Sequence, residues 1–134
     1  MSVVKSKRKT SSTQFLVNIQ SLQKEVLAWC KSQGAKNAPY GLTNMFNAVN
    51  KAFINAYEAN KIYLKEDNYQ QRKQLFDNSI RWLHVFNAEL TALAECYNIS
   101  NTKIKRWCGY SYNAINLIDG VKASDAKRIK KISA

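Results

Sequence analysis

The sequence predicts an all-α protein, an antiparallel up-down-up-down four-helix bundle with basic N- and C-terminal tails. The 134 residues are the size of one domain, and 46% of them are hydrophobic, which is enough for one core. Glycine (4) and proline (1) are scarce, whereas a β-sandwich or barrel needs many turns built from them. Apolar residues also recur at steps of three and four along most of the chain, which is the spacing of amphipathic helices.

The first helix is expected over residues 13–33, with Thr13 as its N-cap and Gly34 just past its end. The following segment, 34–41 (GAKNAPYG), is the clearest loop because it holds the single proline and two glycines. A second helix is expected over residues 43–64, and its alanines would allow a neighbouring helix to approach closely.

The third helix, residues 69–97, is the longest, and apolar residues hold the helical period throughout it. At 1.5 Å per residue it spans on the order of 40 Å, which fits an elongated bundle. Ser100 is the expected N-cap of a fourth helix that ends near Asp119, with Gly120 as the stop signal. The short polar break at residues 65–68 places consecutive helices side by side and antiparallel.

Charge is distributed unevenly along the chain. The formal net charge is +12, from 21 Lys and Arg against 9 Asp and Glu. Residues 1–12 are expected to be a disordered basic tail, residues 13–120 the bundle, and residues 121–134 a basic C-terminal extension. The two tails together carry +8 and the bundle +4. Such a charge favours polyanions, so we expect nucleic acid as a partner and weaker binding at higher salt.

Four groups of residues are candidates for nucleic-acid contact. The tail can wrap a phosphate backbone, and the spacing of Lys103, Arg106 and Tyr110 places two cations and a stacking aromatic on one helix face. The candidates are Lys5, Lys7, Arg8 and Lys9; Arg72, Lys73 and Arg81; Lys103, Lys105, Arg106 and Tyr110; and Lys127, Arg128, Lys130 and Lys131. If the C-terminal extension folds back, its cations would extend the positive end at the start of the fourth helix. Each group also has a non-functional interpretation. The N-terminal tail could only solubilise the protein, and the helix cations could form solvated faces. Trp107, next to Arg106, fits the apolar core stripe, which favours a structural role for the aromatics there.

No catalytic constellation is present in the sequence. It has no glycine-rich phosphate loop, no HExxH and no GxSxG. A ferritin-like di-iron site needs a Glu-x-x-His pair, but Glu89 and Glu95 are followed three residues later by Ala92 and Asn98. We therefore expect a protein that is not an enzyme and has no cofactor.

The three cysteines, Cys30, Cys96 and Cys108, are far apart, and His84 is the only histidine. A structural zinc site needs four well-spaced ligands, so no metal is expected, and the cysteines are expected to be buried in a reducing compartment. The N-terminus lacks the apolar core of a secretion signal, and no apolar run approaches about 18 residues. These patterns predict a cytoplasmic protein without a membrane segment.

Helix-turn-helix, RNP, KH and zinc-finger motifs are all absent, so recognition of backbone and shape is favoured over base reading. The sequence resembles the accessory variability proteins of bacterial diversity-generating retroelements, which belong with the four-helix proteins encoded in ribosomal-RNA intervening sequences. The resemblance covers roughly residues 42–119, and more loosely the first helix, and rests on AVNKAFINAYEA, RWLHVFNAELTALAECYNIS and KIKRWCGYSYNAINLIDG. Its basic positions are Arg72, Arg81, Lys103, Lys105 and Arg106. The two basic tails depart from the plainest versions of that pattern.

The resemblance implies a homopentamer that associates with a reverse transcriptase and its template RNA and supports mutagenic cDNA synthesis without doing chemistry itself. The expected partners are therefore RNA (with DNA or an RNA–DNA hybrid as alternatives), a reverse transcriptase and further copies of the chain. Tyrosines near the predicted helix ends, Tyr63 and Tyr112 among them, suit subunit contacts. Two other interpretations stay open: a bundle associated with ribosomal RNA or the ribosome, and a structural adaptor whose charge only solubilises it.

Overall fold

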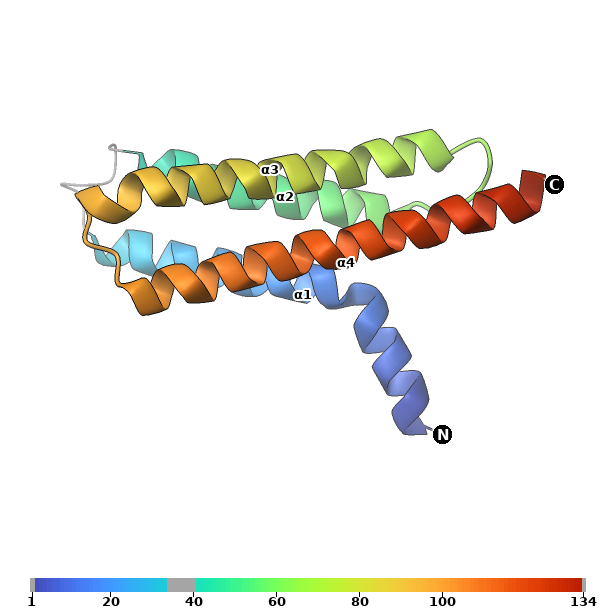
Figure 1. Cartoon of the computed structure of the whole chain (residues 1–134), viewed down its shortest axis with the longest axis horizontal. Helices are drawn as coiled ribbons and strands as arrows, with labels where there is room; N and C mark the ends of the chain where they lie inside the picture. Colours follow the sequence, from blue (N-terminus) through green and yellow to red (C-terminus); the bar gives the residue numbers. More distant parts are fainter. Residues whose placement is uncertain (1, 34–40, 134) are drawn as a thin grey trace.

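A computed structural model describes residues 2–33 and 41–133, and in these residues the chain forms four helices and no strand (Figure 1). The helices are α1 (Ser2–Ser32), α2 (Leu42–Lys61), α3 (Tyr69–Cys96) and α4 (Asn101–Ser133). The predicted all-α four-helix bundle is confirmed. None of the helices, as far as they are described, is long and apolar enough to cross a membrane.

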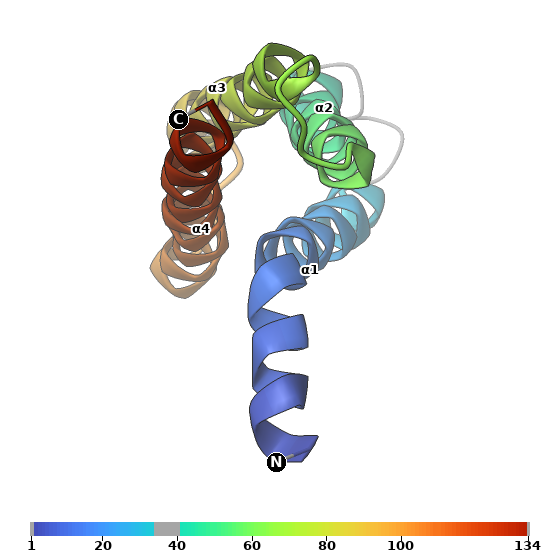
Figure 2. The ribbon, with the colours of Figure 1, turned by 90° about the vertical axis from the view of Figure 1, so that its right-hand side faces the viewer.

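Each helix packs against two others, in the cyclic order α1, α2, α3, α4 (Figure 2). One core fills the space between them, and its largest fully buried side chains are Phe15, Phe76, Phe86 and Trp107. The α2–α3 pair has the most extensive contact, and there the Ser79 hydroxyl donates to the carbonyl oxygen of Ala52 at 2.7 Å. The small side chains on the inner face of α2 allow this close approach, because Ala48, Ala52, Ala56 and Ala59 are all buried.

The contacts between α3 and α4 show that these two helices are antiparallel. Arg72 near the start of α3 pairs with Asp125 near the end of α4, whereas Phe86 packs against Trp107 in the first half of α4 with 6.4 Å between ring centroids. Figure 1 shows the same relation, with α3 and α4 joined at one side of the bundle.

The first helix begins at Ser2 and not near Thr13, so the backbone of residues 2–12, expected to be disordered, is helical. These residues contain neither glycine nor proline, and lysine and arginine are good helix formers, so nothing local ends the helix. In Figures 1 and 2 this segment bends away from the bundle.

The fourth helix continues through Gly120 to Ser133, so the expected stop at Gly120 is wrong. A glycine inside a helix costs about 1 kcal/mol relative to alanine, which other contacts can offset. Two ion pairs follow it directly: Lys122 with Asp77, and Asp125 with Arg72. Residues 121–133 are thus part of α4.

Two connections depend on specific residues. The backbone N–H of Lys103 donates to the Ser100 hydroxyl at 3.2 Å, so Ser100 is the N-cap of α4, as predicted. Gly41 precedes α2 with a φ of 88°, and a Cβ added to it would lie 2.8 Å from Cδ2 of Leu93. Only glycine combines this backbone conformation with so close an approach.

Candidate nucleic-acid interface

The basic residues of α4 lie at opposite ends of the bundle. Arg106 and Arg128 are separated by about 33 Å along a continuous helix. The C-terminal extension is expected to join the cations of residues 103–106 if it folds back. Because α4 is continuous, residues 127–131 lie at the other end of the bundle and cannot do so. We refer to the two places as the Glu25 end and the Arg128 end.

Glu25, on α1, is the centre of a hydrogen-bond cluster at the Glu25 end. Nε of Arg106 donates to both carboxylate oxygens at 2.8 and 2.9 Å, the Tyr110 hydroxyl donates at 3.0 Å and the Trp107 indole at 3.3 Å. The carboxylate raises the pKa of the Arg106 guanidinium above its ordinary value, through the hydrogen bond first and its charge second. Arg106 thus stays charged, but the Glu25 carboxylate balances its charge within the chain, and the Tyr110 hydroxyl already donates to the same carboxylate.

The predicted face of Lys103, Arg106 and Tyr110 does form, but its members are engaged with the protein. Lys103 lies over the ring of Trp107, with Nζ 5.6 Å from the ring centroid, and Trp107 is fully buried. The Arg106 guanidinium lies 5.6 Å from the Tyr110 centroid. Lys105 is also exposed, and unlike Lys103 and Arg106 it has no ion pair or aromatic contact among the described residues.

Arg72 also has a structural role. Its Nε donates to Asp125 at 2.6 Å, and its Nη1 donates to the carbonyl oxygens of Ala59 and Ile62 at 3.1 and 2.9 Å. The side chains of Arg72 and Asp125 are only 11% and 4% exposed. Arg72 therefore satisfies the last carbonyls of α2 while it ties α3 to α4, and it is not available as a free phosphate contact.

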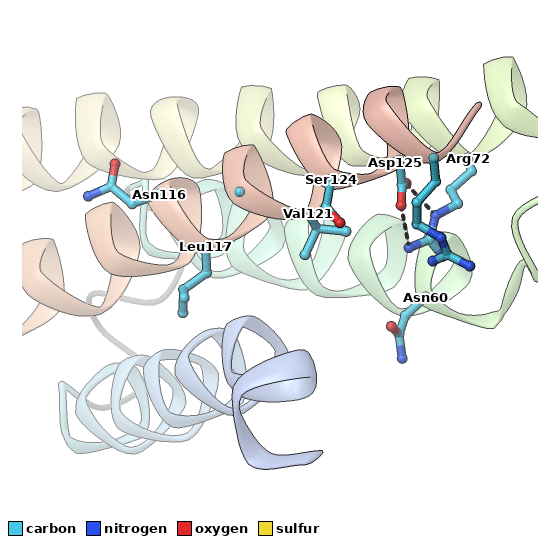
Figure 3. Close-up of a pocket in the computed structure, with 9 residues that line it drawn as sticks. Asn60, Arg72, Asn116, Leu117, Val121, Ser124 and Asp125 are labelled. Carbon is cyan, nitrogen blue, oxygen red and sulfur yellow. Dashed lines mark hydrogen bonds and ion pairs between the residues drawn. The ribbon is translucent and has the colours of Figure 1, made fainter. Parts of the chain in front are cut away.

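Next to this ion pair lies a cleft of about 440 Å³ between the end of α2 and α4 (Figure 3). A second hollow of about 220 Å³ adjoins it at the α2–α3 connection and includes Tyr63. Both are lined by Asn60, Arg72 and Arg128, and we call them together the Arg128 cleft. In Figure 3, Leu117 and Val121 project from α4 along one side of it.

The Arg128 cleft contains polar groups with no internal partner. Within the described part of the chain, the side chains of Asn60, Ser124 and Arg128 have no hydrogen bond or ion pair, and the carboxylate of Asp125 is occupied by Arg72. Lys127 and Lys131 are exposed. Positions 124, 127, 128 and 131 are related by helical steps of three and four, so these four residues share one face of α4. This face carries three unpaired cations beside an open cleft.

The remaining predicted residues are exposed or undescribed. Lys73 follows Arg72 at the Arg128 end, Arg81 lies in the middle of α3, and Lys130 lies on another face of α4 from Arg128; all three are exposed. The side chains of Lys5, Lys7, Arg8 and Lys9 lie outside the described residues.

The expectation of three buried cysteines is wrong. Cys96 is exposed, and Cys30 and Cys108 are half-buried; burial raises the pKa of both of these thiols. Within the described parts of the chain, no group of three His, Cys, Asp or Glu side chains could hold a metal ion.

Sequence reasoning missed Asn60, Tyr63 and Ser124 as members of a site. None is basic, and only the folded arrangement of the helices places them beside Arg128 in the lining of one cleft. In the sequence, Tyr63 is an aromatic residue just after the polar end of a helix. That position is a usable signal of a binding surface, although it indicates subunit contacts equally well. No protein-family model, no curated protein and no solved structure matches the chain.

Proposed function

We propose that the protein is a non-catalytic RNA-binding subunit that holds RNA at the Arg128 end. The observation that supports this most is the face of α4 with Lys127, Arg128 and Lys131, which are exposed and unpaired among the described residues. Each such cation can neutralise one phosphate and release a counterion. At the other end, Glu25 already neutralises Arg106.

We propose further that the RNA is the template of a reverse transcriptase and that several copies of the chain act with that enzyme. The resemblance over residues 42–119 supports this part of the proposal. Mixing the protein with its cognate enzyme and template RNA should give a stable complex and more full-length cDNA. If the enzyme makes full-length product equally well alone, this role is wrong while RNA binding can still hold.

RNA binding is tested with two triple variants that remove equal charge. K127A/R128A/K131A should weaken binding of a single-stranded RNA by about tenfold or more at 0.1 M salt and reduce the slope of log K against log salt by about 2. K24A/K103A/K105A removes three cations at the Glu25 end, leaves the Glu25 cluster intact and should weaken binding less. Fluorescence anisotropy at several salt concentrations measures both. Equal losses in the two variants, or no RNA affinity in the wild type, would contradict the proposal.

A further inference from the structure

We infer that the Arg128 cleft holds one unpaired nucleotide of a single-stranded RNA, with its base stacked on Tyr63 and its phosphate on Arg128. This inference rests on the proposed RNA binding and specifies the form of RNA that is bound. It depends on three observations: an exposed aromatic ring on a hydrogen-bonded backbone segment, unpaired polar groups around it, and a hollow of suitable size.

Tyr63 is an exposed ring on a fixed backbone. The residue is 76% exposed, the most among the large hydrophobic residues exposed in the described parts of the chain. Its carbonyl oxygen accepts a hydrogen bond from Asn68 at 2.6 Å, the preceding carbonyl of Ile62 accepts from Arg72, and the following residue, Leu64, is buried. A ring presented to solvent from a backbone held on both sides can stack a base without the cost of ordering that backbone.

The polar groups around the ring match the other parts of a nucleotide. Arg128 lines both hollows, has no acidic partner among the described residues and can hold a phosphate in a bidentate manner. Asn60 also lines both, and its amide can donate to and accept from the edge of a base. Asp125 would repel a phosphate if it were free, but Arg72 binds both of its oxygens.

The size of the cleft fits a small ligand better than a duplex. Its larger hollow, about 440 Å³, lies within the range of small-ligand sites, which begins at about 300 Å³, and the adjoining hollow adds about 220 Å³. Leu117 and Val121 supply an apolar wall in the larger hollow. Bases in a duplex are already stacked on one another, so only an unpaired base can use the Tyr63 ring.

The test compares Tyr63→Ala with two matched tyrosine variants on a single strand of about 12 nucleotides and on the corresponding RNA duplex. Tyr63→Ala should weaken single-strand binding by about 5- to 100-fold, leave duplex binding unchanged and leave the salt slope unchanged, because no charge is lost. Tyr63→Phe should bind like the wild type. Tyr112→Ala, which removes a 50% exposed ring from α4, should have no effect.

A second pair of variants tests the phosphate contact. Arg128→Ala and Lys130→Ala each remove one exposed cation from α4, but only Arg128 lines the cleft. Arg128→Ala should lower single-strand affinity several-fold more than Lys130→Ala. If Tyr63→Ala binds the single strand as tightly as the wild type, or weakens single strand and duplex alike, the nucleotide site is wrong although RNA binding stands. A wild-type protein that binds neither RNA at about 0.15 M salt would overturn the proposed function as well.

Discussion

The two ends of the bundle contain similar side chains in opposite states. At the Glu25 end, Arg106, Trp107 and Tyr110 all donate to one carboxylate from α1. At the Arg128 end, the nearby carboxylate of Asp125 is held by Arg72, so Tyr63 and Arg128 stay available. A cluster of cations and aromatics is therefore available to a partner only where its own members are not already paired within the chain.

The two carboxylates also differ in burial, which sets the energy of each pair. Arg72 and Asp125 are 11% and 4% exposed, whereas Arg106 and Glu25 are 60% and 30% exposed. Removing one partner of a buried pair leaves an unpaired charge away from water, while an exposed charge is solvated again. The Arg72–Asp125 pair is thus the stronger structural link of the two.

The largest effect is expected from Arg72→Ala, which should lower the free energy of unfolding by about 3–5 kcal/mol because Asp125 stays buried without a partner. Urea unfolding measures this loss. The matched control is Lys73→Ala, the exposed neighbour on α3, which should change stability by less than about 0.5 kcal/mol. If both variants have the same stability, the link between α2, α3 and α4 is weaker than its geometry indicates.

A smaller effect is expected from Glu25→Gln, which tests whether pairing with Glu25 keeps Arg106 from contacting RNA. The neutral amide that this substitution introduces cannot balance the Arg106 charge, so RNA affinity should rise several-fold and the salt slope should steepen by about 0.7. Glu95→Gln is the matched control, because it removes the same charge at an exposed position with no ion pair among the described residues. Anisotropy titrations of the two variants should differ; identical gains would mean that only net charge matters.

The smallest effect concerns the cysteines, all of which lie near the Glu25 end. Cys96 should react first with a thiol reagent, because it is exposed, while burial raises the pKa of Cys30 and Cys108. A raised pKa means less thiolate at neutral pH, so these two should react more slowly and speed up only as pH rises towards and beyond about 9. Mass spectrometry of timed labelling reactions separates the three sites. Equal rates at neutral pH would show that this end opens readily.

The fold was largely predictable where its signals are local. The bounds of α2 and α3 agree with prediction to within a few residues, because the apolar period and the polar break at residues 65–68 are local features. Ser100 could be identified as an N-cap for the same reason. The end of α4 could not, because Gly120 is a local stop signal and the residues that overcome it, Arg72 and Asp77, lie far away in the sequence.

The candidate site was only half predictable. Lys127, Arg128 and Lys131 stand out by charge, but nothing near Arg106 in the sequence shows that Glu25, at a separation of 81 residues, neutralises it. Likewise, Asn60 and Tyr63 are ordinary polar and aromatic residues until folding brings them and Arg128 to the lining of one cleft.

The sequence by itself determined an all-helical bundle with a large excess of positive charge, because helical periodicity and composition are properties of the chain alone. Only the tertiary structure decided which cations are free. An ion pair depends on distance in space, and helices packed side by side bring Glu25 to Arg106 and Asp125 to Arg72. The same packing leaves Arg128 unpaired beside an open cleft.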